Sequence, residues 1–225
     1  ELLLMDEPLS NLDARLRLEM REEIRRIQNE TGVTTIFVTH DQEEAMAISD
    51  SIILMKDGML IQEGYSQDLY ENPCCRFTAD FLGNPPINDL EYPSGIPESL
   101  MNLHPILNKK TLKMSQGEDF PNSTSKKLLL SLRPECFIIK KDSSQSNSFP
   151  AVVKNLSLLG KEQLCILELP TFSLKTSLEN NKNDSVFVRA VFGTEEVFEL
   201  NQSLTLSFAK KGVFLFNLEN GERVS

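Results

Sequence analysis

The chain has 225 residues, of which 40% are hydrophobic and 25% are charged, a composition typical of globular proteins. It contains no run of about 18 apolar residues and no recognisable signal peptide, so we expect no membrane-spanning segment. The net charge of −10 at pH 7 argues against nucleic acid as a partner, because contacts with phosphates require a basic surface.

Charge divides the chain into two parts. Residues 1–83 contain 17 acidic and 7 basic side chains, whereas residues 84–225 contain 16 of each. An acidic part next to a neutral part predicts two domains, which we place at residues 1–88 and 89–225. The four cysteines match no zinc-binding spacing, and we expect them to be unpaired thiols of a reducing cytosol.

The chain opens with an apolar run, Leu2–Met5, that ends in the pair Asp6-Glu7. Apolar residues on both faces predict a buried strand, and open α/β folds bind their ligands at the carboxyl ends of such strands. Apolar residues at helical spacing then predict a helix that begins after the N-cap Asp13 and ends at Gly32.

A second apolar and β-branched segment, Val33–Thr39, predicts another buried strand, and His40 follows it directly. Asp41 begins a capping box that opens a short helix. A strand, a helix and a strand in this order predict parallel, right-handed pairing, which places both carboxyl ends at one edge of the sheet. If the two strands are neighbours, Asp6-Glu7 and His40 converge there, since adjacent strands lie about 4.8 Å apart.

The later segments are shorter. Asp57-Gly58 predicts the turn of a β-hairpin, and two short helical pieces follow, up to Leu82. Frequent Pro, Ser, Asn and Lys predict a loose linker at residues 89–127, in which Leu100–Leu112 is compatible with short strands or a helical turn. The remainder predicts a small barrel or sandwich with strands at 128–132, 136–139, 151–158, 163–169, 186–191, 204–208 and 213–218.

Asp6 and Glu7, at the end of a predicted buried strand, match the second nucleotide motif of a P-loop ATPase. In such a site the first carboxylate helps to hold Mg²⁺, and the second orients and deprotonates the attacking water. Both residues are also compatible with a plain polar transition from strand to loop, and a lone histidine such as His40 is commonly a structural residue. The predicted meeting of the two strand ends favours the functional interpretation.

Longer strings of the sequence resemble the ATP-binding subunits of ABC transporters, in particular the importers of sugars, polyols and glycerol phosphate. The resemblance is nearly complete over residues 1–88 and patchy over residues 89–225. It rests on Leu2–Arg17, Val38–Ala45, Asp50–Gly58, Gln62–Gly64, Leu69–Pro73, Phe81–Asn88, Leu132–Glu135, Leu159–Gly160 and Phe214–Gly221.

The resemblance implies a role for each candidate residue. Asp6 would be the Walker B aspartate that contacts Mg²⁺ through water, and Glu7 would be the catalytic base. Ser10 and Asp13 would belong to the D-loop, which meets the nucleotide-binding loop of a second ATPase subunit in a homodimer; Asp13 can serve as N-cap at the same time. His40 would be the switch histidine that contacts the γ-phosphate of ATP.

The fold that the resemblance implies is α/β. Residues 1–88 would form the C-terminal half of a P-loop, RecA-like ABC ATPase core, and residues 89–225 an OB-like, TOBE-type β-barrel accessory domain. Such a subunit is a peripheral protein of the cytoplasmic face of the cell membrane, where it binds the transmembrane permease subunits. The segment 91–127 fits the family poorly.

Three family motifs are absent from the sequence: the phosphate-binding Gly-x-x-x-x-Gly-Lys-Ser/Thr loop, the Gln-loop and the Leu-Ser-Gly-Gly-Gln signature. We expect them upstream of Glu1, so that this chain is a C-terminal fragment that is inactive alone. Half of a parallel sheet should then show a bare edge near Leu2–Met5. Smaller departures are Ser51 and Ser131, where relatives commonly carry Arg and Gly.

Taken together, these observations predict the ATP-hydrolysing subunit of an ABC importer for a sugar, a polyol or a glycerol phosphate. Two alternatives stay open. The cargo can be a polyamine or a metal, because the permease and the binding protein select it, although Asn84–Asn88 favours a sugar or polyol. The chain can also be a non-catalytic regulatory or scaffold protein, but Asp6-Glu7 and His40 would then have no chemical purpose.

Overall fold

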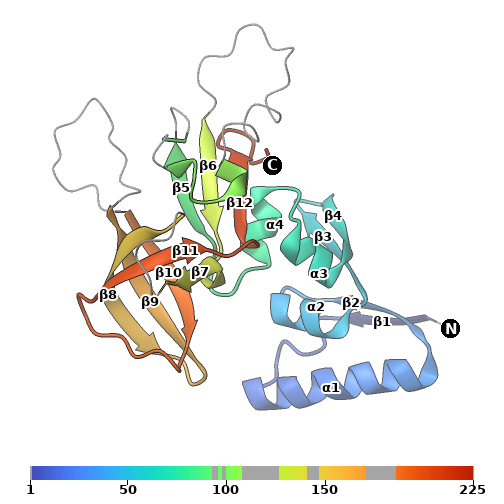
Figure 1. Cartoon of the computed structure of the whole chain (residues 1–225). Coiled ribbons are helices and arrows are strands. Elements are labelled where there is room, and N and C mark those ends of the chain that lie inside the picture. Colours follow the sequence, from blue (N-terminus) through green and yellow to red (C-terminus); the bar gives the residue numbers. More distant parts are fainter. Residues whose placement is uncertain are drawn as a thin grey trace, which may run out of the picture. The chain divides into compact units, whose positions relative to one another are not determined.

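The structure is a computed structural model that describes residues 2–92, 96–97, 100–107, 127–140, 147–170 and 186–224. The chain forms two compact units (Figure 1). The first comprises Glu1–Cys74 and Phe81–Gly83, and the second comprises Cys75–Asp80 and Asn84–Ser225. This division lies close to the predicted boundary after residue 88, and the assignment of the two units to named domains remains a prediction.

The first unit begins with a parallel strand pair that a helix connects. It contains β1 (Leu2–Asp6), α1 (Ala14–Thr31), β2 (Thr34–Val38) and α2 (Gln42–Ile48). The two strands pair in parallel with Leu2 opposite Thr34 and Asp6 opposite Val38, which confirms that they are neighbours whose carboxyl ends are level. The polar residues that follow the two strands therefore emerge at the same edge of the sheet.

Helix α1 begins and ends at the predicted residues. Asp13 has extended backbone angles, and its side chain accepts hydrogen bonds from the amides of Arg15 and Leu16, as an N-cap does. Gly32 ends the helix with φ 64°, a left-handed conformation that glycine adopts without a steric penalty. Inside the helix, Ile24 is buried in a small core with Leu9 and Ile48.

The prediction that β1 is a buried strand is wrong for this structure. Leu2, Leu3 and Leu4 are 57%, 40% and 66% exposed. The physical reason is that, within the part of the chain that the structure describes, β1 pairs with β2 alone, and a sheet of two strands cannot cover its own faces. Ile36 and Val38 on β2 are exposed for the same reason. The prediction of a bare sheet edge near Leu2–Met5 is confirmed.

The first unit continues with the hairpin β3 (Ser51–Lys56) and β4 (Met59–Tyr65). At its turn Asp57 and Gly58 both have positive φ, 50° and 76°, as a tight two-residue hairpin turn requires, so the predicted Asp-Gly turn is confirmed. Helix α3 (Ser66–Glu71) follows, and its buried Leu69 packs with Ile52 and Leu82.

The second unit contains two antiparallel sheets. The larger sheet has the order β10-β9-β8-β11-β7, and the smaller has the order β12-β6-β5. Short helices lie at α4 (Arg76–Phe81), η2 (Pro105–Leu107) and η3 (Pro134–Cys136). The strands are β5 (Asn88–Tyr92), β6 (Leu128–Leu132), β7 (Phe137–Ile139), β8 (Phe149–Leu158), β9 (Glu162–Leu169), β10 (Val186–Gly193), β11 (Ser203–Phe208) and β12 (Val213–Asn217).

The two sheets of the second unit share one hydrophobic core. It includes Leu130 from the smaller sheet together with Val153 and Leu167 from the larger one. Asn88 joins the sheets with polar contacts: its Nδ2 donates to the carbonyls of Leu132 (3.0 Å) and Arg189 (2.8 Å), and its Oδ1 accepts from the Arg189 amide (2.7 Å). The chain thus combines an α/β unit with a β-rich unit, as the sequence predicts.

Strand β5 corrects the prediction of a loose linker from residue 89. It pairs with β6 along its whole length, from Asn88 opposite Leu132 to Tyr92 opposite Leu128. Its five residues include Asn, Asp and Glu, and this polar content hides a short strand whose Leu90 and Tyr92 are buried. The rest of the predicted linker lies largely outside the described residues, as does residue range 108–112 of the segment compatible with short elements.

Candidate functional site

The residue after β1 has an unusual backbone. Glu7 has φ 41°, in the left-handed region that costs an L-residue about 1–2 kcal/mol. Its amide donates to the carbonyl of Val38 at 2.9 Å, so it remains attached to β2. The Glu7 carbonyl accepts from the Ser10 amide (3.3 Å) and the Ser10 hydroxyl (3.0 Å). These bonds turn the chain sharply after Asp6 and hold Glu7 in the strained conformation.

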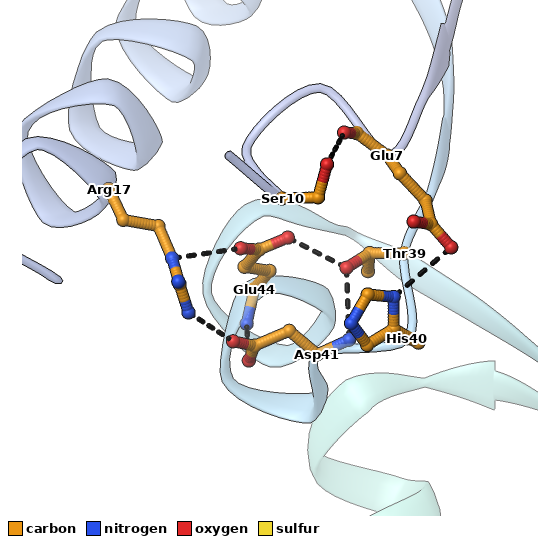
Figure 2. A pocket seen from close by; sticks show the side chains of 7 residues that line it. All are labelled: Glu7, Ser10, Arg17, Thr39, His40, Asp41 and Glu44. Atoms are coloured by element: carbon orange, nitrogen blue, oxygen red, sulfur yellow. Dashed lines mark hydrogen bonds and ion pairs between the residues drawn. The ribbon is translucent and has the colours of Figure 1, made fainter. Parts of the chain in front are cut away.

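Glu7 and His40 are in contact, as their positions at the ends of neighbouring strands predict. The Oε1 atom of Glu7 lies 3.1 Å from Nδ1 of His40, and Figure 2 shows the two side chains pointing toward one another. Both remain accessible, with side chains that are 47% and 73% exposed. A carboxylate next to an imidazole can orient the ring, because the ring nitrogen that faces it carries the hydrogen in the neutral form.

A shallow hollow of about 40 Å³ adjoins this pair. Of the five candidate residues, Glu7, Ser10 and His40 line it. Asp6 is exposed at the end of β1 but does not line the hollow, and Asp13 serves as the N-cap of α1. The structure therefore brings three of the predicted site residues together and leaves two outside the hollow, and their predicted roles stay predictions.

Four further residues line the hollow that the sequence does not single out as functional. They are Arg17, Thr39, Asp41 and Glu44. A capping box would direct the Glu44 side chain to the Asp41 amide. In the structure Thr39 takes that place: its Oγ1 accepts from the Asp41 amide (3.0 Å) and donates to Glu44 Oε2 (2.7 Å). The order Thr39-His40-Asp41 is the sequence signal for this contact, because a threonine hydroxyl can accept a hydrogen bond from the amide two residues further on.

An ion pair fixes the other end of α2. Arg25 of α1 donates to Asp50 Oδ1 (2.6 Å) and to the carbonyl of Ile48 (3.0 Å). The hydrogen bond from this guanidinium lowers the pKa of the Asp50 carboxyl below its usual value. Asp50 is largely exposed and Arg25 is partly exposed, so we expect this pair to orient α2 rather than to add much stability.

The side chains that are present fit one side of a magnesium–nucleotide site. Mg²⁺ commonly keeps several waters and binds to one or two carboxylates together with substrate phosphates. One exposed carboxylate, such as that of Asp6, is therefore enough for the protein side of such a site. Among the described residues no group of three or more His, Cys, Asp or Glu side chains is placed to hold a metal alone. The hollow has room for a few waters, whereas pockets for small ligands measure about 300–1,000 Å³.

The described part of the chain has no helix that is both long and apolar enough to cross a membrane. No protein-family model matches the chain.

Similarity to curated proteins covers nearly the whole chain. An Fe(3+) ions import ATP-binding protein of Fusobacterium nucleatum is 34% identical over 94% of this chain. The xylose/arabinose import ATP-binding protein XacK of Haloferax volcanii is 34% identical over 99% of it. The sn-glycerol-3-phosphate import ATP-binding protein UgpC 3 of Rhizobium etli is 37% identical over 71%.

The matches cover 54%, 54% and 41% of these three proteins, so the chain spans about half the length of the curated relatives it matches. The cargoes in the names of these relatives differ: they are ferric ions, the pentoses xylose and arabinose, and glycerol phosphate. What the relatives share is the ATP-binding role in an importer, and the sequence similarity extends over both units. The chain is therefore a homologue of the ATP-binding proteins of ABC importers.

Proposed function

We propose that this chain forms the hydrolytic part of the ATP-hydrolysing subunit of an ABC importer. The observation that carries the proposal is the 3.1 Å contact between Glu7 and His40 at the ends of two parallel strands. The same subunit would bind ATP and Mg²⁺, pair with a second copy and dock on transmembrane permease subunits at the cytoplasmic face of the membrane. We further propose that the complete protein extends beyond this chain and that the chain is inactive alone.

In this function each residue has a defined task. The Glu7 carboxylate accepts the proton of the attacking water, and its strained backbone directs it away from β1. With Nδ1 of His40 held by Glu7, Nε2 is the ring nitrogen left for a phosphate oxygen, to which it donates when the ring carries both hydrogens. Asp6 would hold Mg²⁺ through water, and Ser10 and Asp13 would form the loop that meets the second subunit. Bound Mg²⁺–ATP supplies the γ-phosphoryl group and the metal charge that stabilises its transfer.

For the cargo we propose a sugar, a polyol or a glycerol phosphate. The relatives named for glycerol phosphate and for xylose and arabinose support this cargo, whereas other relatives are named for ferric ions. Uptake of labelled glycerol phosphate, pentose, polyamine and iron by cells that lack the gene decides between these cargoes. Loss of iron or polyamine uptake alone would contradict the proposal.

The test of the enzymatic function compares Glu7→Gln with wild type in the complete protein. We expect ATP hydrolysis to fall about 10²–10⁴-fold while ATP binding persists, because glutamine cannot accept the proton. Glu19→Gln is the matched control, since Glu19 lies exposed on α1 and pairs with Arg15. Equal hydrolysis by Glu7→Gln and wild type would contradict a catalytic Glu7.

Calorimetry on the 225-residue chain tests the proposal that it is inactive alone. We expect no binding of Mg²⁺–ATP, because no glycine-rich loop in this sequence supplies amides for the phosphates. Micromolar affinity would contradict it. A regulatory or scaffold protein is the second candidate, favoured by the extensive core of the second unit. A protein that binds no ATP even in its complete form would support this candidate.

A further inference from the structure

One side chain connects the two loops that carry Glu7 and His40. Arg17 lies in the first turns of α1, and its Nη2 donates to the carbonyl of Leu12 at 3.1 Å. Its Nη1 donates to Asp41 Oδ2, also at 3.1 Å. Its Nε lies 3.7 Å from Glu44 Oε1, which is an ion pair but too long for a hydrogen bond. Figure 2 shows Arg17 reaching toward both carboxylates.

The carboxylates that Arg17 contacts define the turn around His40. Oδ1 of Asp41 accepts from the amides of Glu43 (2.8 Å) and Glu44 (3.1 Å), so Asp41 caps α2 with one oxygen and binds Arg17 with the other. Glu44 accepts the Thr39 hydroxyl at 2.7 Å, and the same hydroxyl accepts the Asp41 amide at 3.0 Å. The residues on both sides of His40 are therefore tied to the partners of Arg17.

The carbonyl that Arg17 contacts belongs to the loop that follows Glu7. Within this loop the Leu12 amide donates to the carbonyl of Leu9 (3.2 Å), and the Ser10 amide donates to the carbonyl of Glu7 (3.3 Å). Leu9 is buried with Ile24 and Ile48, which anchors the middle of the loop. A shift of the Leu12 carbonyl thus reaches Glu7 through two successive turns of hydrogen-bonded backbone.

The burial of the network explains why an arginine is suited to this position. Glu44 is only 3% exposed, and a buried carboxylate needs a cation and hydrogen bonds. Arg21 also lies near Asp41, at 3.8 Å, so a second positive charge is present. What Arg17 adds is geometry: a planar guanidinium can donate to a carbonyl and a carboxylate on different elements, whereas a lysine ammonium has no such fork.

We infer that Arg17 is a positioning residue, which fixes the loop 7–13 relative to the turn 39–41 and so keeps Glu7 in contact with His40. The effect of Arg17 on catalysis rests on the proposed function. The effect of Arg17 on the structure does not rest on it, because the contact between Glu7 and His40 can be measured without ATP.

Nitrogen NMR of the 225-residue chain at pH 8 measures which ring nitrogen of His40 carries the hydrogen. The chain has two histidines, so His40→Gln assigns the signals. In wild type we expect the neutral ring to carry its hydrogen mainly on Nδ1, facing Glu7. In Arg17→Lys, which keeps the charge, we expect the ratio of the Nδ1–H to the Nε2–H form to fall about fivefold, as for the loss of one ordinary hydrogen bond.

Arg15→Lys is the matched control, because Arg15 lies two residues away on α1 and its side chain pairs with the exposed Glu19, away from the hollow. It should leave the ratio unchanged. Amide signals of β2 show whether each variant is folded, and Arg17→Gln serves as a second variant if Arg17→Lys is not. A folded Arg17 variant with the wild-type ratio would overturn the inference.

Hydrolysis by the complete protein gives the second measurement. We expect Arg17→Lys to lower kcat about tenfold with the KM for Mg²⁺–ATP unchanged. Loss of stability alone would lower the amount of active protein, but it would leave the ratio of the two hydrogen positions on the His40 ring unchanged. A changed ratio with an unchanged kcat would support the positioning of His40 by Arg17 and overturn its importance for catalysis. If wild type itself hydrolyses no ATP, the proposed function fails, while the ratio in the two Arg17 variants still tests the contact.

Discussion

Two leucine-rich strands, one in each unit, show how far similar sequences can differ in burial. In β1, Leu2, Leu3 and Leu4 are between 40% and 66% exposed. In β6, every residue from Leu128 to Leu132 is buried. The difference arises from neighbouring strands. β6 is the middle strand of its sheet and faces a core shared with a second sheet, whereas among the described residues β1 pairs with β2 alone.

The comparison teaches that the candidate chemistry lies in the less buried unit. Glu7 and His40 extend from the exposed pair β1–β2, and the contacts that hold them are hydrogen bonds and ion pairs rather than a thick apolar core. The second unit contributes an extensive hydrophobic core but none of the residues of the candidate site. The arrangement of the site in the first unit should therefore depend on single polar contacts. The stability of the second unit should depend on the buried volume of its apolar side chains.

The largest effect should separate the two strands directly. Leu130→Ala removes a side chain that is completely buried, and we expect it to lower the free energy of unfolding of the second unit by about 2–5 kcal/mol. Leu4→Ala, on the exposed strand, should change the stability of the first unit by less than about 0.5 kcal/mol. Hydrogen exchange of the β6 and β2 amides during urea titration measures each unit. Similar costs at both positions would contradict the comparison.

The two strands also mark what the sequence can predict. The elements of the described residues follow from local pattern: the strand at 128–132, the Asp-Gly hairpin turn and both ends of α1 are confirmed. The burial of β1 was predicted wrongly, because it depends on which strands and helices lie beside it. Strand β5 was missed, since its polar residues hide the two buried side chains.

The candidate site was predictable in part for a related reason. Parallel pairing across one helix brings Glu7 to His40, and that inference needs only the order of the elements. The role of Arg17 could not be predicted, because several charged residues lie off the apolar stripe of α1 and nothing local distinguishes this one. Its partner Asp41 is 24 residues away, and only the folded chain shows the contact.

A smaller effect tests the dependence of the first unit on polar contacts. Thr39→Val keeps the shape of the side chain but removes the hydroxyl between the Asp41 amide and the buried Glu44. We expect a loss of about 1–3 kcal/mol in the free energy of unfolding, because a buried carboxylate loses its donor. Thr34→Val on the exposed side of β2 is the control and should cost less than about 0.5 kcal/mol. Equal stability of the two variants in denaturant titrations would show that the network contributes nothing.

The strain at Glu7 gives a still smaller effect with a characteristic sign. Because φ is 41°, Glu7→Gly should be more stable than Glu7→Ala by roughly 0.5–1 kcal/mol, since glycine adopts this conformation freely. The same pair of substitutions at Glu19, inside α1, should show the opposite order, because glycine weakens a helix relative to alanine. Thermal unfolding followed by circular dichroism measures both pairs. Alanine more stable than glycine at both positions would exclude backbone strain at Glu7.

The smallest effect is a slope with pH, and it tests whether the second unit excludes water as its burial indicates. His104 is buried against Phe208, and its Nδ1 accepts the Ile106 amide at 3.2 Å. Burial lowers the pKa of His104 below 6.5, an effect that nearby backbone groups offset only in part. The unfolded chain therefore binds this proton more readily, so the contribution of His104 to the free energy of unfolding should be constant above about pH 6.5 and decline as the pH falls below it.

His104→Asn keeps an acceptor for the Ile106 amide and removes the titrating group. Hydrogen exchange of β6 between pH 7.5 and 5.5 measures the free energy of unfolding. The carboxylates affect wild type and variant alike, so this free energy should decline less in the variant than in wild type. The same decline in both proteins would mean that water reaches His104, and the contrast between a dry second unit and an exposed first unit would then be smaller than the two leucine strands indicate.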